Sequence, residues 1–263
     1  MARETFILSY MVVLVTIFVI GLCLGSFLNV VIDRWPEEKS VMKGRSHCDY
    51  CKKKLAPVDL IPLFSFLFLR GRCRYCQKKL SCQYPLVELM TGLLFVITYF
   101  FYSSNYLETV YYLILVCYMI VIFMIDLKLE LVLEKVINSA IVLTFLYQLS
   151  KLEFLQLGVN LASGIFVALF FLLLIEISKH RGMGEGDVKI GFWMGLILGI
   201  KVSLALFIAF VGGALVGLLL IFLGKKKFGQ TVPLAPFLMS GMYITLLWGE
   251  QIINWYFSVF LTS

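Results

Sequence analysis

The sequence predicts an all-α polytopic membrane protein, with about eight transmembrane helices and one polar loop large enough to form a subdomain. Apolar residues make up 61% and charged residues 15% of the 263 positions, whereas a soluble domain has about 45–50% and about 25%. The mean hydropathy is +0.94. Because the apolar residues are clustered in runs near the roughly 20 residues that cross a bilayer, we expect a membrane protein rather than a soluble one.

Eight apolar runs are the expected spans: 6–32, 84–102, 109–126, 135–150, 157–178, 188–200, 202–223 and 233–250. The first continues from Leu8 into Gly25–Ile32 with no small-residue cleavage site and no basic leading region. We therefore interpret it as a retained span and not as a signal peptide. The expected organisation is a first transmembrane helix (1–33), a cytoplasmic loop (34–83) and a seven-helix core (84–263).

The net charge of +7 is distributed unevenly along the chain. If the N-terminus lies outside, twenty of the 23 Lys and Arg residues fall in the odd-numbered loops and the span ends beside them. Only Arg3, Lys151 and Lys201 fall on the other side. This asymmetry is the positive-inside signal of a membrane protein. It predicts that the loop 34–83 is cytoplasmic. It also explains the positive net charge by the orientation of the chain in the lipid bilayer, so no nucleic-acid partner is needed.

Four of the seven cysteines form two pairs, Cys48 with Cys51 and Cys73 with Cys76, separated by 21 residues. Two such pairs supply the four thiolates of a closed tetrahedral zinc site. The spacing between the pairs slightly exceeds the usual zinc-ribbon window. The predicted cytoplasmic side disfavours lasting disulfides, and the surrounding Lys and Arg favour thiolates. We therefore expect structural Zn²⁺, with a redox dithiol or free thiols as the alternatives.

Two aspartates stand at span ends that the predicted orientation places at the cytoplasmic face. Asp126 ends the third span, and Asp187 opens the sixth. Ionisable groups inside spans are costly and mark function, and two neighbouring carboxylates can share one proton and hydrolyse an amide by acid and base catalysis. Gly184 and Gly186 permit irregular backbone and close approach of a substrate strand. The alternative is a pair of solvated helix-end residues.

Further polar and small residues support this site. Asp187, Gly191, Gly195 and Gly199 recur every four residues, so they share one helix face that can pack tightly. Asn29 and Glu88 lie inside spans, where they either line the cavity or form interhelical hydrogen bonds, and we favour the hydrogen bonds. His180 follows Glu176 by four residues, which favours a local helix pair.

These residues together carry a resemblance to a known family, the type IV prepilin peptidases. The motifs, in chain order, are Gly25-Ser-Phe-Leu-Asn-Val-Val-Ile32 with Arg34-Trp-Pro36, the four paired cysteines, Tyr84-Pro-Leu-Val-Glu88, Met124-Ile-Asp126, Gly182-Met-Gly-Glu-Gly-Asp-Val-Lys189 and Pro233-Leu-Ala-Pro-Phe-Leu238. The resemblance covers nearly the whole chain. It implies that Asp126 and Asp187 are the catalytic pair and that Lys189 belongs to the second aspartate motif.

The resemblance also implies an activity and a location. Enzymes of this family are GxGD-type aspartic peptidases of the bacterial cytoplasmic membrane. They cut type IV prepilins and pseudopilins, the substrates of pilus assembly and protein secretion, after a glycine that ends a short basic leader. Many also methylate the new N-terminus with S-adenosylmethionine, a function tied to the cysteine loop. An archaeal-type preflagellin peptidase and a zinc-stabilised scaffold or transporter without catalysis are the alternatives.

One element departs from the family pattern. An Ile/Leu-Pro-Asp/Asn element usually follows the first aspartate, but Val132-Leu133-Glu134 stands in that place without a proline. The residues of 127–135 are good helix formers, yet 127–131 alternate apolar and polar side chains, which suits an extended segment. Because a peptide substrate is cleaved in extended form and can pair with such a segment, we predict a non-helical break within 127–134.

Overall fold

The structure is a computed structural model that describes residues 2–41, 44, 46–48, 50–179, 183–225 and 232–260, with side chains from position 8 to 259. Over this part of the chain the regular structure is helical, apart from two isolated β-bridges. The elements in chain order are α1 (Ala2–Arg34), η1 (Pro57–Leu60), α2 (Phe64–Phe68), α3 (Gln83–Tyr102), α4 (Tyr106–Leu129), α5 (Glu134–Ser150), α6 (Phe154–Ile177), α7 (Glu185–Leu198), η2 (Gly199–Lys201), α8 (Val202–Phe222) and α9 (Ala235–Phe260). The predicted all-α class is confirmed.

The long helices occupy the eight apolar runs expected from the sequence. Five segments of the described chain are long and apolar enough to cross a membrane: Leu8–Arg34, Gln83–Tyr102, Tyr106–Leu129, Phe154–Ile177 and Glu185–Phe222. The last of these joins α7, η2 and α8 in 38 residues, whereas α5, with 17 residues, and α9 are not among the five. The chain is thus a multi-pass membrane protein by helix length and apolarity, and the count of eight spans stays a prediction.

By packing, the chain forms two compact units, residues 1–121 and 122–263. The boundary between the units falls within α4 and matches none of the boundaries expected from the sequence, which separate a first helix, a loop and a core. That expected organisation stays a prediction. Each unit is described by itself below.

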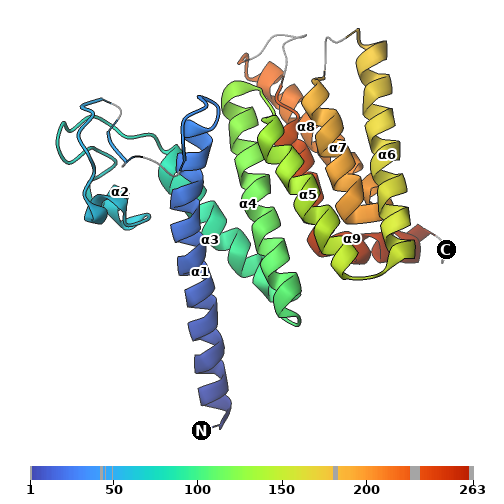
Figure 1. The fold of residues 1–263 in the computed structure, drawn as a ribbon, viewed down its shortest axis with the longest axis horizontal. Helices are drawn as coiled ribbons and strands as arrows, with labels where there is room; N and C mark the ends of the chain where they lie inside the picture. Colours follow the sequence, from blue (N-terminus) through green and yellow to red (C-terminus); the bar gives the residue numbers. More distant parts are fainter. Residues whose placement is uncertain are drawn as a thin grey trace. The chain divides into compact units, whose positions relative to one another are not determined.

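In the first unit α1 and α3 pack along each other (Figure 1). Glycines on α1 allow the close approach: a Cβ on Gly21 would lie 2.7 Å from the Cα of Gly92, and one on Gly25 would lie 2.7 Å from the Cα of Glu88. Real Cβ atoms are essentially never found below 3.0 Å from another heavy atom. Helix contact through small residues is the usual packing mode inside membranes, where the hydrophobic effect does not draw helices together.

In the second unit α6 and α7 pack most closely, and α5 and α9 also contact α7. The predicted glycine face of α7 forms this contact, because a Cβ on Gly195 would lie 2.5 Å from the Cα of Gly164, and one on Gly191 would lie 2.8 Å from Val167. Across α7, the indole of Trp193 donates to the Thr144 hydroxyl on α5 at 2.9 Å. These contacts fix the rotation and depth of α7, which carries Asp187.

The predicted break after Asp126 is confirmed. Helix α4 ends at Leu129, residues 130–133 are not helical, and α5 begins at Glu134. Glu130 ends α4 in the left-handed region, with φ 52°, a conformation more common for glycine at this position. The chain thus stops the helix with a strained glutamate and without a proline.

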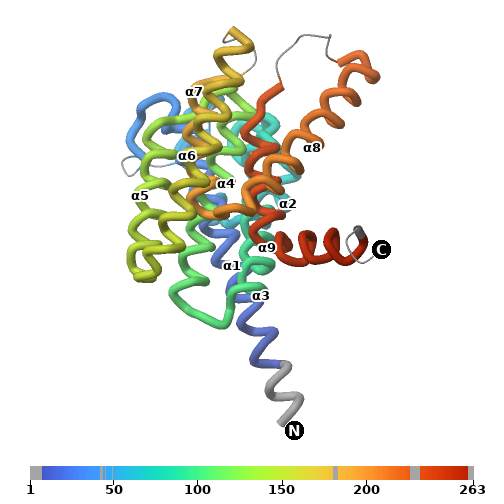
Figure 2. Tube along the Cα trace, turned by 90° about the vertical axis from the view of Figure 1, so that its right-hand side faces the viewer, coloured from blue at the N-terminus to red at the C-terminus, as the bar shows by residue number. Residues whose placement is uncertain are grey.

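The C-terminal part of α9 turns away from the direction of its first part (Figure 2). Exposed aromatic side chains lie on this part, namely Trp255, Tyr256 and Phe257. Such residues are enriched at headgroup level, so we expect 251–260 to lie at a membrane surface.

Candidate functional site

Asp126 lies in the last turn of α4, and its side chain is only 6% exposed. One carboxylate oxygen, Oδ2, accepts a hydrogen bond of 3.0 Å from the backbone amide of Ala235. Ala235 is the first residue of α9, where amides have no partner inside the helix. The positive end of the α9 dipole therefore faces this carboxylate and stabilises its negative charge.

Asp187 is the third residue of α7 and is 8% exposed. Its Oδ2 accepts a hydrogen bond of 3.2 Å from the amide of Gly184, the N-cap residue. This contact is the acidic half of a capping box. The expectation of irregular backbone at the glycines before Asp187 holds at Gly184 but is wrong at Gly186, because the helix already begins at Glu185. The Asp187 carboxylate accepts a hydrogen bond from the Gly184 amide, which has no partner inside the helix, and this contact favours a helix that begins at Glu185.

The structure brings the two predicted aspartates together within the second unit. Their carboxylates lie close enough to interact electrostatically. Each also accepts a hydrogen bond from the N-terminal end of a helix, Asp126 from α9 and Asp187 from α7. Two nearly buried carboxylates that interact electrostatically can share one proton. The positive ends of the two helices then stabilise the negative charge of the carboxylate that stays ionised.

The segment 130–133 closes against the first turn of α7. A Cβ on Gly186 would lie 2.5 Å from the Cβ of Val132, so only glycine allows this approach. Next to it, the ammonium of Lys189 pairs with Glu134 Oε1 at 2.5 Å. That hydrogen bond and the charge of Lys189 lower the pKa of Glu134. Gly186 thus contacts the non-helical segment 130–133, and Lys189 pairs with the first residue of α5.

Asn29 and Glu88 make their contacts inside the first unit. The Asn29 amide donates to the carbonyl of Tyr84 on α3 at 3.1 Å, and Glu88 accepts a hydrogen bond of 2.8 Å from the backbone amide of Leu63. Leu63 has φ 60°, so Glu88 holds a strained turn of the polar loop against α3. The favoured interpretation of Asn29 as an interhelical hydrogen bond is confirmed.

The four paired cysteines form a cluster. The Sγ atoms of Cys48, Cys51, Cys73 and Cys76 all lie within 4.8 Å of one another, and those of Cys48 and Cys76 are 3.8 Å apart. Tetrahedral zinc with Zn–S bonds of about 2.3 Å has sulfur–sulfur edges of about 3.8 Å. The spacing of these sulfur atoms therefore suits a tetrathiolate metal ion.

The two cysteine pairs lie in matching turns. In each turn the backbone amide of the first cysteine donates to the backbone carbonyl of the lysine five residues later. The distances are 3.0 Å for Cys48 to Lys53 and 2.9 Å for Cys73 to Lys78. The lysines then cross between the turns, since Lys53 lies over the ring of Tyr75 and Lys78 over that of Tyr50, at 4.4 and 4.8 Å from the ring centres. Such cation–π contacts join the two turns independently of a metal.

The environment of Cys73 favours its thiolate. Burial of the Cys73 thiol opposes ionisation, but hydrogen bonds from the backbone amides of Cys76 and Tyr75 and from neighbouring thiols outweigh burial and lower its pKa to about 7. The Tyr75 amide lies 3.4 Å from this sulfur. A thiolate is the form that binds a metal ion.

Comparison with known proteins adds an independent finding. Residues 19–102 match the Bacterial Peptidase A24 N-terminal domain, and residues 113–221 match the Type IV leader peptidase family. The chain is 30% identical over 246 residues to the Prepilin leader peptidase/N-methyltransferase of Bacillus subtilis, covering 93% of this chain and 98% of that protein. The chain belongs to the type IV leader peptidase family.

Two other relatives match the chain over different extents. The protein of the same name from Aeromonas hydrophila is 32% identical over 275 residues, covering 93% of this chain and 94% of that protein. The one from Myxococcus xanthus is 53% identical over 81 residues, 31% of this chain and 24% of that protein. No solved structure matches the chain.

The sequence analysis did not predict two contacts of this candidate site, those of Ala235 with Asp126 and of Glu134 with Lys189. The Ala235 amide is 109 positions from Asp126. Its sequence signals are the quoted motif 233–238, to which it belongs, and Pro236 immediately after it, since proline is common in the first turn of a helix. Glu134 stands where the family has Asp or Asn, so its pairing with Lys189 could have been suspected from the opposite charges in two quoted motifs.

Proposed function

We propose that this chain is a membrane aspartic endopeptidase that removes the basic leader from type IV prepilins and pseudopilins, after a glycine and at the cytoplasmic face of the bacterial inner membrane. The single observation that carries the proposal is the pair of nearly buried, interacting carboxylates of Asp126 and Asp187. Membership of the leader peptidase family supports the substrate class. The uneven distribution of Lys and Arg supports the orientation.

The chemistry follows from the sharing of one proton. The ionised carboxylate takes a proton from a water molecule as that water attacks the scissile carbonyl carbon, and the protonated partner donates its proton to the carbonyl oxygen. Collapse of the tetrahedral intermediate breaks the C–N bond, and the nitrogen leaves with a proton returned by the pair. The amides of Gly184 and Ala235 hold the two carboxylates in place throughout.

The second unit also offers a place for extended substrate. Residues 130–133 are not helical. They follow the last turn of α4, which carries Asp126, and Val132 contacts Gly186, the residue before Asp187. A backbone in this form can pair with an extended peptide. We propose that the segment aligns the scissile bond with the carboxylate pair.

We further propose that the cysteine cluster holds structural Zn²⁺. The 3.8 Å separation of the Cys48 and Cys76 sulfur atoms supports this ion. Bound zinc supplies a fixed crosslink between the two turns and no catalytic group. The loop 34–83 otherwise has few buried side chains, so the crosslink keeps its fold.

Methylation of the new N-terminal amine with S-adenosylmethionine is the second proposed activity. The names of the Bacillus subtilis and Aeromonas hydrophila relatives, both Prepilin leader peptidase/N-methyltransferase, support it. S-adenosylmethionine, when bound, would supply the methyl group from its sulfonium.

The deciding experiment is mass spectrometry of a prepilin-type substrate co-expressed with the chain. We expect loss of the leader after glycine and a methyl increment on the new N-terminus. Asp126→Asn and Asp187→Asn should each abolish cleavage while the protein stays folded in the membrane, and Glu153→Gln, an exposed carboxylate at the other end of α6, serves as the control. Substantial cleavage by either folded aspartate variant would contradict the carboxylate pair, whereas absence of cleavage by the wild type would favour a scaffold or transporter.

A further inference from the structure

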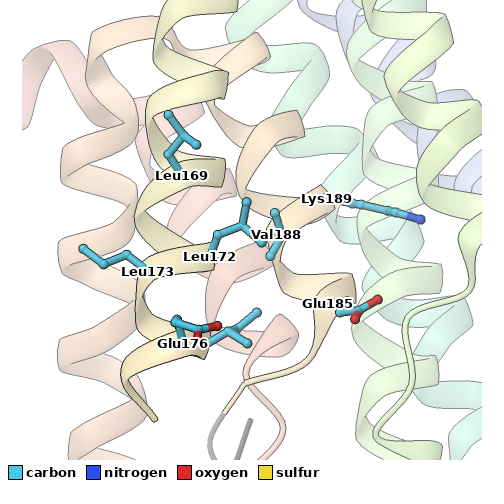
Figure 3. A pocket seen from close by; sticks show the side chains of 8 residues that line it. Leu169, Leu172, Leu173, Glu176, Glu185, Val188 and Lys189 are labelled. Carbon is cyan, nitrogen blue, oxygen red and sulfur yellow. The ribbon is translucent and has the colours of Figure 1, made fainter. Parts of the chain in front are cut away.

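A groove lies between α6 and the first turn of α7, beside the aspartate pair. It encloses about 580 Å³. Its wall is apolar, with Leu169, Leu172 and Leu173 on α6 and Val188 on α7 (Figure 3). Val188 is the residue immediately after Asp187, so the groove borders the turn of α7 that carries Asp187.

The two ends of the groove differ in chemistry. Glu176 lies in the last turn of α6 and Glu185 is the first residue of α7. Because the two helices are consecutive and pack together, both carboxylates mark the same end, as Figure 3 shows, while the leucines lie farther from it. A segment that fills the groove therefore meets negative charge first and an apolar wall afterwards.

The carboxylates are available for a partner. Within the described residues neither Glu176 nor Glu185 has an ion pair, whereas Lys189, the cation that also lines the groove, is already paired with Glu134. His180, which the sequence suggested as a partner of Glu176, is outside the described residues, and α6 already ends at Ile177.

The position of Glu176 is also unfavourable for folding alone. The C-terminal end of a helix carries the negative end of the helix dipole, where a cation is preferred to a carboxylate. Glu185, at a helix N-terminus, is favoured there by the same dipole. Helix stability therefore accounts for Glu185 but not for Glu176, which suggests a role in binding.

We propose that this groove binds the segment around the cleavage site of the substrate, with its cationic residues at Glu176 and Glu185 and its following apolar helix against the leucines. The occupant is a chain in which positive charge directly precedes an apolar helix. This inference rests on the proposed function, because a prepilin-type leader and its following apolar segment have that order of charge and apolarity. Charge complementarity at one end and apolar contact at the other set the depth at which the scissile bond meets the aspartates.

The test is a kinetic comparison in detergent or liposomes with a purified prepilin-type substrate carrying Lys and Arg in its leader. We expect Glu176→Gln to raise KM about tenfold or more with little change in kcat, and Glu176→Gln with Glu185→Gln to raise it further. Glu153→Gln, also exposed on the α6 side but at its opposite end, should leave both constants unchanged. Glu176 is on a different helix from Asp187, so its variant leaves the turn of Asp187 in place.

Two further arms make the assignment specific. A substrate with Glu in place of the leader's basic residues should be cleaved poorly by the wild type and better by Glu176→Lys. A photo-crosslinking amino acid in place of Leu172, in the Asp187→Asn background, should capture the apolar segment of the substrate, whereas the same group in place of Leu146, exposed on α5, should not.

The outcomes separate the two proposals. Wild-type cleavage with an unchanged KM in Glu176→Gln, or crosslinks from position 172 to lipid alone, overturns the groove and leaves the peptidase proposal standing. Absence of cleavage by the wild type overturns the peptidase proposal and the groove with it.

Discussion

Gly186 and Val132 meet at a distance that only glycine permits at position 186, since a Cβ on the glycine would lie 2.5 Å from the Cβ of the valine. The contact joins the extended segment after α4 to the first turn of α7. Asp126 lies four residues before that segment begins, and Asp187 follows Gly186 directly. The closeness of these two backbones therefore sets how the two carboxylates face each other.

The first prediction removes this closeness. Gly186→Ala should reduce cleavage at least tenfold, because the added methyl group pushes α7 away from the segment and a displacement of about 1 Å at a catalytic group costs about a hundredfold in rate. The measurement is the rate of leader removal at saturating substrate.

A reciprocal change provides its control. Val132→Gly opens the same space from the other side, so the double variant Gly186→Ala with Val132→Gly should recover much of the lost rate. Equal loss in the single and double variants would show that Gly186 acts through backbone freedom and not through this contact.

The sequence predicted the helices well because apolar runs bounded by polar residues leave few alternatives in a membrane. It also predicted the cysteine cluster, because paired thiols at this spacing are a strong signal. The break after Asp126 was harder, since local propensity favoured helix and only the alternation of 127–131 opposed it. The left-handed Glu130 that ends the helix has no sequence signature.

Other features depend on tertiary contacts that local patterns do not record. The Ala235 amide reaches Asp126 only after α9 packs in the second unit. The start of α7 at Glu185 was missed because the glycines suggested irregular backbone, while the reciprocal hydrogen bond of Asp187 with Gly184 favours helix. The crossed lysine–tyrosine contacts reflect a repeated Cys-x-Tyr-Cys-x-Lys-Lys pattern that the sequence does contain.

The second prediction concerns the ion pair of Lys189 and Glu134. Lys189→Met and Glu134→Gln should each slow cleavage about two- to fivefold, as expected for a pair that is largely exposed, and the double variant should be no slower than either single one. The rates of the four proteins give the coupling directly. Additive losses would mean that the two residues act separately.

The pH dependence of this pair has a definite sign. Lys189 lowers the pKa of Glu134, so the contact contributes above the ordinary carboxyl pKa and is lost as the pH falls through the lowered value. The difference in stability between the wild type and Glu134→Gln should therefore shrink below about pH 4.5. Thermal unfolding in detergent at several pH values measures it.

The third prediction is one zinc ion per chain, held by the four clustered cysteines. Elemental analysis of the purified protein should find it, Cys73→Ser should lose it, and Cys23→Ser, exposed on α1, should keep it. Because binding requires thiolates and the pKa of Cys73 is about 7, zinc affinity should fall as the pH is lowered from 8 to 5. Free alkylation of all four thiols in metal-replete protein would contradict the site.

Zinc removal should affect the two units unequally. A chelator should loosen the loop 34–83, which hydrogen exchange would show as faster exchange of the amides of Cys48 and Cys73, now hydrogen-bonded across their turns. Exchange at α7, which belongs to the other unit, should stay unchanged. Equal loosening of both would assign the metal a role in the whole fold.

The last prediction restores the proline that the family has after the first aspartate. Leu133 has φ −74° and ψ 120° and precedes the first turn of α5, which is the backbone that proline prefers. Leu133→Pro should therefore be tolerated and should raise the free energy of unfolding by about 0.4–1 kcal/mol, by restricting the unfolded chain.

Leu127→Pro, six residues earlier and inside α4, should instead cost about 3 kcal/mol, because it removes a helical hydrogen bond. Thermal unfolding in detergent distinguishes the two, and destabilisation by Leu133→Pro comparable to that by Leu127→Pro would mean that the helix runs through position 133. If the prediction holds, the break rests on the left-handed Glu130 and the contact of Val132 with Gly186, and the proline of the relatives only reinforces a conformation that this chain reaches through packing.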